Sequence, residues 1–261
     1  MLKFPPSINN VKSKEIIEKY WSRLRKLVES NEKMIGENSL AHLRTRSRAI
    51  EYLHYMPYIF ERVPLKSSVL DWGAQHGHVS LLLRLIGMSP IPYVVCPPPQ
   101  VVKSLNELFS GEHVSSTEPI TLPFKSVSID AVVSSGVLEH VEEYGGNVAQ
   151  SVAEIARVLK QGGFFFIWKL PVNASISEIK SDLFGGWSHD TRFSSRQIRR
   201  ILEKGGFSVD LCIEEGLLPL RVKAVLRAMR CVFIENFIDS FAQRWPMKIF
   251  ATDLFVIAKK L

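Results

Sequence analysis

The stretch that constrains the fold most strongly reads Val69-Leu70-Asp71-Trp72-Gly73-Ala74-Gln75-His76-Gly77-His78. It begins with apolar residues that end in an acid, and two glycines then lead into the helical pattern of residues 79–86. Glycine lets a ligand approach the backbone, and the start of a helix presents N–H groups to a carboxylate or a phosphate. The stretch therefore predicts a buried strand, a tight turn and a helix, in which the turn is either a ligand site or a purely structural corner.

Short strands and helical patterns alternate from residue 67 onward. The sequence predicts helices at 79–86, 100–109, 148–159 and 194–204, and strands at 68–72, 92–95, 127–134, 164–170, 207–213 and 253–258. Alternation of this kind produces an α/β fold, a mostly parallel sheet with helices on both faces. Ligands of such sheets bind outside the carboxyl ends of the strands.

Two segments fall outside this alternation. Residues 1–66 contain helical patterns at 13–35 and 39–55, the second ended by Pro57, and they predict a helical N-terminal extension. Residues 67–261 then form the main domain.

That domain carries an insertion at 216–250, before the last strand. Within the insertion, residues 221–233 have an apolar stripe opposite basic residues. This pattern fits a helix that packs on the domain, and it also fits a helix that touches an anionic membrane surface or a lipid-tailed substrate.

Composition describes a globular chain. Its 261 residues are 46% hydrophobic and 23% charged, which excludes a disordered chain. No apolar run approaches the roughly 20 residues that span a bilayer, and the first residues lack the apolar core of a signal peptide. Cys96, Cys212 and Cys231 have no paired spacing, which argues against a disulfide scaffold or a zinc site. We therefore expect a cytoplasmic protein.

Charge is unevenly distributed along the chain. Residues 1–66 hold 13 basic and 7 acidic groups, a net of +6, and residues 164–261 hold 15 and 10, a net of +5. Residues 67–163 hold 5 and 9, a net of −4. Basic flanks attract a phosphate-bearing substrate, an anionic membrane or nucleic acid, and they also serve solubility alone.

Several motifs occur in register after the first turn. They are Leu122-Pro123-Phe124, Ile129 to Val141 with its Leu138-Glu139-His140-Val141, Glu154 to Phe164 with its Arg157-Val158-Leu159-Lys160-Gln161-Gly162-Gly163, His189 to Ser194, and Gly205-Gly206-Phe207. Together with residues 69–77, these motifs make the chain resemble class I S-adenosylmethionine-dependent methyltransferases of the broad small-molecule type. The resemblance covers residues 67–214 and the closing strand. It implies a doubly wound, mostly parallel, seven-stranded Rossmann-like sheet whose last strand is antiparallel.

The resemblance also implies S-adenosylmethionine as cofactor and assigns roles to residues. Asp71, Gly73 and Gly77 would form the cofactor turn, with Asp71 near the amino-acid end. Glu118 matches an acid beside the adenine, and Ser134, Ser135 and Gly136 would border the methionine portion. We interpret Asp130, Glu154 and Arg157 as structural.

Two positions depart from the family pattern. Gln75 stands where the family usually has a glycine, and it adds bulk at the cofactor turn. Cys96, followed by Pro97-Pro98-Pro99, stands where an acid usually grips the ribose hydroxyls. Cysteine is a weak partner for a diol, and prolines offer no N–H. The chain is therefore either a methyltransferase or a catalytically silent binding module with weak or no cofactor binding.

Methyl transfer from a sulfonium depends mainly on alignment, and a hydroxyl acceptor benefits from a general base. The candidate bases are His140, just after the fourth strand, and His189, in a loop that borders the acceptor pocket in related enzymes. Each histidine can equally be structural. The linear spacing contains no metal-ligand pattern, so we predict no metal.

The expected acceptor is a small molecule or a lipid- or sugar-linked metabolite, and the N-terminal extension and the insertion are expected to form a lid over it. A nicotinamide oxidoreductase is disfavoured because Gly73 to Gly77 does not meet the G-x-G-x-x-G spacing. A nucleic-acid partner is not expected, since basic residues are scattered and no aromatic stacking series is found. Peripheral membrane contact through 221–233 stays open, and the sequence does not indicate the oligomeric state.

Overall fold

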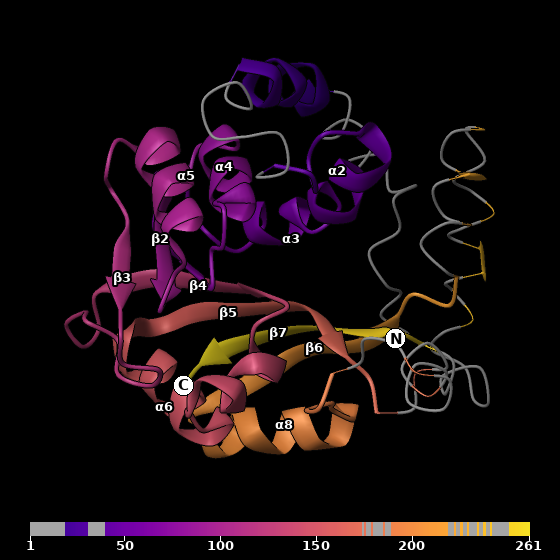
Figure 1. Ribbon diagram of the computed structural model, residues 1–261. Helices are drawn as coiled ribbons and strands as arrows, with labels where there is room; N and C mark the ends of the chain where they lie inside the picture. The colour runs from indigo at the N-terminus through magenta and orange to yellow at the C-terminus, as the bar shows by residue number, and fades with distance from the viewer. Residues whose placement is uncertain are drawn as a thin grey trace.

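Among the described residues, seven strands form one sheet through the middle of the molecule (Figure 1). The computed structural model describes residues 19–30, 40–173, 189–218 and 251–261, with isolated positions at 175, 179, 185, 222, 225–226, 229, 234, 237–238 and 241. The strands are β1 (Ser68–Trp72), β2 (Ser89–Val95), β3 (Val114–Ser116), β4 (Ile129–Ser135), β5 (Leu159–Pro171), β6 (Phe207–Glu215) and β7 (Asp253–Lys260). Their order is β3-β2-β1-β4-β5-β7-β6, with β7 antiparallel to both neighbours, which confirms the predicted fold class.

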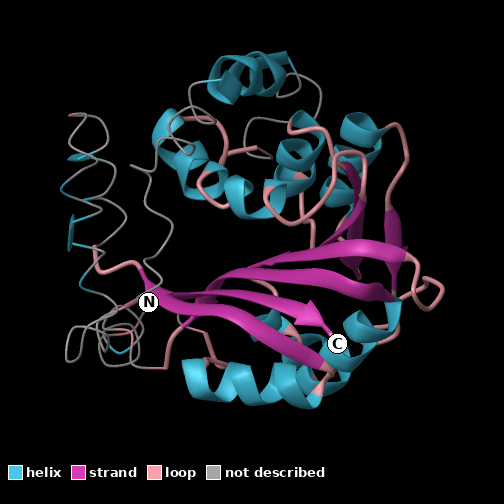
Figure 2. Cartoon of the chain, turned by 180° about the vertical axis from the view of Figure 1, so that it is seen from behind, coloured by secondary structure: helices cyan, strands magenta, loops and turns pink. Residues whose placement is uncertain are grey.

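Helices enclose the sheet from both faces (Figure 2). One face carries α2 (Arg46–Leu53), α3 (Met56–Phe60), α4 (His78–Leu85) and α5 (Pro99–Phe109), and the other carries α6 (Val148–Val158) and α8 (Ser195–Lys204). Each layer packs its apolar stripe on the sheet, so the core has two parts. The 3-10 turns η1 (Leu138–His140) and η2 (Glu142–Tyr144) follow β4.

The described part of the N-terminal extension shares its core with the sheet. Residues 19–30 are helical, and Leu24 belongs to the same buried cluster as Trp168 and Phe255. The Tyr55 ring stacks on Trp168 of β5, with ring centroids 4.9 Å apart and an interplanar angle of 9°. The Tyr55 hydroxyl donates to the Glu215 carboxylate at the end of β6. The extension is therefore fixed to the sheet at the carboxyl end of β5.

The helix predicted at 39–55 is wrong in its bounds. Residues 40–45 form turns and bends, and α2 begins at Arg46, where the Thr45 hydroxyl caps it by accepting from the Arg48 amide. Pro57 does not end a helix; it lies in the first turn of α3, where a proline costs no hydrogen bond. The helical spacing was correct, but the predicted end of the helix, residue 55, lies two residues after the observed end at Leu53.

Two strands begin earlier than predicted, and β3 was not predicted at all. β2 begins at Ser89 and contains Pro90 and Pro92. Prolines are tolerated there because β3 pairs with β2 only from Tyr93 onward, so no β3 ladder bond needs their missing N–H groups. β5 begins at Leu159, which pairs with Ile129 across a register shift. Three-residue β3 is too short to produce a periodic signal.

Three charged residues support the strands from their starting edge, in agreement with their structural interpretation. The Asp130 carboxylate accepts from the Ser68 amide and hydroxyl at 2.8 and 2.7 Å and from Lys160 Nζ at 2.6 Å, which ties β4 to β1 and β5. Arg157 donates to the Leu122 and Phe124 carbonyls at 3.0 and 2.9 Å, and Glu154 accepts from the Leu122 amide at 2.8 Å. These bonds hold the Leu-Pro-Phe segment on α6.

Most of the insertion at 216–250, including most of the helix predicted at 221–233, lies outside the described residues. The described positions Val222, Val225 and Met229 are 42%, 57% and 66% exposed. None of the described helices has the length and apolar character needed to cross a bilayer.

Candidate functional site

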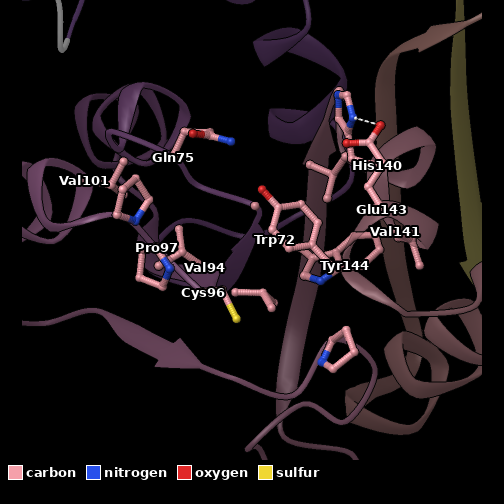
Figure 3. A pocket seen from close by; sticks show the side chains of 16 residues that line it. Trp72, Gln75, Val94, Cys96, Pro97, Val101, His140, Val141, Glu143 and Tyr144 are labelled. Carbon is pink, nitrogen blue, oxygen red and sulfur yellow. Dashed lines mark hydrogen bonds and ion pairs between the residues drawn. The ribbon is translucent and has the colours of Figure 1, made fainter. Parts of the chain in front are cut away.

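A pocket of about 260 Å³ opens at the carboxyl ends of β1, β2 and β4 (Figure 3). This volume lies just below the range of small-molecule sites, roughly 300–1,000 Å³. One wall comes from the ends of β1 and β2 and the start of α5, and the other from η1 and η2. The lining residues are Trp72, Gly73, Gln75, Val94, Val95, Cys96, Pro97, Pro98, Val101, Pro119, Gly136, Val137, His140, Val141, Glu143 and Tyr144.

The turn after β1 requires glycine at two positions. Gly73 has φ +81°, and a Cβ there would lie 2.9 Å from one methyl group of Val137 and closer still to the other. Gly77 has φ +82°, and a Cβ there would lie 2.6 Å from the Phe109 ring. Gly73 lines the pocket and Gly77 packs behind it. The amides of Gly73 and Ala74 both donate to the Tyr93 carbonyl at 2.9 Å, so they fix the turn to β2 and are not directed at a ligand.

Gln75 lies in the pocket wall at the position where the family usually has a glycine. Its backbone is in the left-handed region with φ +49°, a conformation that suits glycine and strains other residues. The next residue is held in place, because His76 Nδ1 lies 2.9 Å from the Ser104 hydroxyl of α5. The turn therefore keeps a glycine-like backbone while it places a polar side chain at the pocket.

Asp71 lies behind the turn and is not among the lining residues. Its side chain is 1% exposed and accepts a hydrogen bond of 2.6 Å from the Ser80 hydroxyl of α4. Burial raises the pKa of the Asp71 carboxyl to about 7, and the Ser80 hydrogen bond opposes part of this rise. Asp71 thus joins β1 to α4, and a role for it at the amino-acid end of a cofactor stays a prediction.

Cys96 forms the corner between β2 and α5. It lines the pocket with φ +45°, and its Sγ lies 3.9 Å from the Thr117 carbonyl, a weak contact. Pro97 and Pro98 continue the same wall, so the wall is apolar where the family usually has an acid.

The remaining predicted cofactor residues lie next to the pocket without lining it. Glu118 is exposed, and its neighbour Pro119 lines the wall. Ser134 is fully buried, and its hydroxyl has no hydrogen-bond partner among the described residues. Ser135 is half-buried at the end of β4, and Gly136 after it reaches the pocket. The sequence did not predict the apolar residues that line the pocket. Their only sequence signal is that they lie close to the ends of predicted strands.

The two candidate bases lie side by side. The ring centroids of His140 and His189 are 5.4 Å apart, and the Nε2 atom of each lies 4.0 Å from Glu139 Oε1. His140 lines the pocket, and its Nδ1 lies 2.8 Å from Glu143 Oε1. The structure therefore brings together the histidines that the sequence proposed separately, and it adds Glu139 and Glu143, which sequence reasoning missed.

Glu139 is the buried acid of this group. It is 2% exposed, and its Oε2 has no hydrogen-bond partner among the described residues. Burial raises the pKa of the Glu139 carboxyl to about 7, although its own backbone amide and His140 act in the opposite direction. The prediction of no metal came from linear spacing, and nothing in the structure tests it.

Comparisons with known proteins agree with the resemblance drawn from the motifs. Residues 70–167 match the model of a methyltransferase domain family. No curated protein matches the sequence.

Solved structures share the fold at low sequence identity. An S-adenosylmethionine-dependent methyltransferase from Aquifex aeolicus is 14% identical, with a TM-score of 0.51 over 92% of this chain and 98% of that one. A protein from Galdieria sulphuraria, described as a candidate sarcosine dimethylglycine methyltransferase, is 16% identical, with a TM-score of 0.55 over 82% and 86%. SpnF, described as a [4+2]-cyclase, is 16% identical, with a TM-score of 0.51 over 84% and 82%. These likenesses establish a class I methyltransferase fold, and the cyclase shows that this fold also serves other chemistry.

Proposed function

We propose that residues 67–261 form an S-adenosylmethionine-dependent methyltransferase that acts on a small molecule or on a lipid- or sugar-linked metabolite. The observation that carries this proposal is the pocket, because all of its lining residues fall within residues 70–167, the range that matches the methyltransferase family model. Bound S-adenosylmethionine would supply a methyl group on a sulfonium, which a nucleophile takes by direct displacement. The protein's own contribution is to bind, align and exclude water.

The pocket residues fit this cofactor. Gly73 lets the ligand approach the backbone at a position where a Cβ has no room. The apolar wall of Val94, Pro97, Val101 and Pro119 suits a flat purine ring. Gln75 also lines the pocket, and its amide, which can both donate and accept, would hold the polar amino-acid portion.

The acceptor side lies at His140 and His189, which remain our candidates for the general base. His140 is in the pocket wall, and the Glu143 carboxylate beside Nδ1 fixes its ring. That contact favours a proton on Nδ1 and leaves Nε2 able to take a proton from a hydroxyl acceptor. His189 is placed beside it because Arg192 donates to its carbonyl at 2.8 Å and the Phe193 amide donates to the Pro171 carbonyl at the end of β5.

Calorimetric titration tests the proposal. S-adenosylmethionine and S-adenosylhomocysteine should each bind one site per chain, and NADH should give no heat. Absence of binding at millimolar cofactor would support the silent binding module. The side chain of Gln75 and the wall formed by Pro97 and Pro98 would then explain why the cofactor does not bind.

Cys96, at the position where related enzymes usually hold the ribose with an acid, gives a separate prediction. Cys96→Asp should tighten S-adenosylmethionine binding by about one to two decades, since a charged hydrogen bond contributes roughly 1.5–3 kcal/mol. Aspartate suits the position because it tolerates the left-handed backbone that Cys96 adopts. Titration of the variant beside Cys96→Asn, which has the same shape without the charge, measures the effect. Equal affinity in the parent and both variants would show that another group holds the ribose.

Membrane contact through residues 221–233 is a further proposal about partners. It is supported by the exposed apolar side chains of Val222, Val225 and Met229 and by the basic residues of that segment. Salt-dependent co-sedimentation with anionic vesicles is the measurement that decides it.

A further inference from the structure

Glu139, His140 and His189 form a cluster of three possible metal ligands. One ligand atom from each lies within 4.8 Å of the other two. Glu139 and His140 come from η1, directly after β4, whereas His189 precedes Phe193, which pairs with Val172 after β5. Because β4 and β5 are neighbours in the sheet, two distant segments of the chain meet at this point.

The donor set has a defined chemistry. Two imidazole nitrogens and one carboxylate oxygen match the three protein ligands of catalytic zinc sites, in which further positions are left for water or substrate. The Glu139 carboxylate is nine-tenths buried or more, and its Oε2 has no partner among the described residues, which is costly for a buried acid. We propose that Glu139, His140 and His189 bind a divalent transition-metal ion of the zinc class at the edge of the pocket.

The surroundings of the cluster support this site. Glu143 Oε1 lies 2.8 Å from His140 Nδ1, as the dashed line in Figure 3 shows. A carboxylate on the outer nitrogen of a metal-bound histidine fixes the ring and directs the other nitrogen at the metal. Gly136 adds room, since a Cβ there would lie 3.3 Å from Glu139 Oε1.

The position of the cluster gives the ion a use. His140, Glu143 and Gly136 all line the pocket, so a bound ion would lie at the edge of the space where the acceptor is proposed to lie. The ion would hold an oxygen atom of the acceptor there. The acceptor would therefore carry a hydroxyl or a carboxylate beside the atom that is methylated. This use rests on the proposed function, whereas metal binding itself does not. With the ion bound, the Nε2 atoms of His140 and His189 would be its ligands, so the general-base role proposed above applies only to the metal-free site.

The geometry needs only a small adjustment. With metal–ligand bonds of roughly 2.1 Å, neighbouring ligand atoms of a tetrahedral ion lie roughly 3.4 Å apart. Each Nε2 now lies 4.0 Å from Glu139 Oε1. The ligand atoms of the two histidines lie within 4.8 Å of each other. Rotation of the three side chains would bring their ligand atoms closer together around an ion.

Zinc titration of the chelator-treated full chain tests the site, in the absence of any cofactor. We expect one Zn²⁺ per chain, bound on the order of micromolar or tighter, and visible d–d absorption when Co²⁺ replaces it. Glu139→Gln and His189→Gln should each weaken Zn²⁺ binding by about 100-fold or more, and Glu143→Gln by about 10- to 100-fold. His113→Gln, which changes a histidine before β3, is the matched control and should bind zinc like the parent.

Two outcomes would overturn the site: zinc binding only at millimolar concentration, or tight binding that all three site variants retain. Thermal unfolding of each variant shows whether it is folded, and Glu143→Gln tests the site even if the buried Glu139→Gln does not fold. Because the readout is metal alone, zinc binding without S-adenosylmethionine binding would refute only the proposed function, and the reverse result would refute only the metal.

Discussion

Gly73→Val is expected to abolish S-adenosylmethionine binding while the chain stays folded. Valine disfavours the left-handed backbone that Gly73 adopts, and its Cβ would collide with Val137, which lines the opposite side of the same pocket. Either the turn or Val137 must move into the ligand's space. We expect affinity to fall by about 100-fold or more, which corresponds to about 2.7 kcal/mol, measured by calorimetric titration.

The matched control for this variant is Gly111→Val. Gly111, which follows α5, has a similar φ of +79°, and a Cβ there would meet nothing closer than 3.9 Å, at the side chain of Asn106 within α5. It carries the same backbone strain far from the lining residues, so it should lose comparable thermal stability and keep its affinity. If Gly73→Val is folded and binds S-adenosylmethionine as well as Gly111→Val does, the turn after β1 is not the cofactor site.

The fold could be predicted because its signals are local. Apolar runs, glycine turns and helix ends each lie within a few residues, and the helix predicted at 194–204, for example, is α8 at Ser195–Lys204, with Ser194 as its cap. The errors arose where a tertiary partner decides the outcome. β2 can contain Pro90 and Pro92 because of where β3 begins to pair, and β5 begins at Leu159 because β4 pairs with it there.

The site could be predicted only in part, for the same reason. The pattern at residues 71–77 predicted a turn after the first strand, and Gly73 and Gln75 of this turn line the pocket. The left-handed backbone of Gln75 and Cys96 could not be predicted from the residue types. The grouping of Glu139 with His189 depends on the adjacency of β4 and β5, so linear spacing could not show it. Polar residues such as Glu118 and Ser134 drew attention from sequence, whereas the pocket is largely lined by apolar residues that any core would use.

Trp168→Ala is expected to lower the free energy of unfolding by about 3–5 kcal/mol, measured by urea denaturation. Trp168 is fully buried in β5, and its ring supports Tyr55, which in turn contacts Phe255 with ring centroids 4.9 Å apart. A loss of this size is large against the roughly 5–15 kcal/mol that holds a domain together. Trp168→Phe is the matched control: it keeps an aromatic ring, and it removes an indole N–H that has no partner among the described residues, so it should cost much less.

The same variant shows how the N-terminal extension is coupled to the sheet. Since α2, α3 and β5 share one buried cluster, amide hydrogen exchange in Trp168→Ala should accelerate in the helices and the sheet strands together. The carbonyl of Trp168 also accepts from the Gly136 amide at 3.1 Å, so loosening β5 should weaken S-adenosylmethionine binding as well. Faster exchange confined to residues 46–60, with strand protection and affinity unchanged, would instead show that the extension is a separate unit resting on an independent domain.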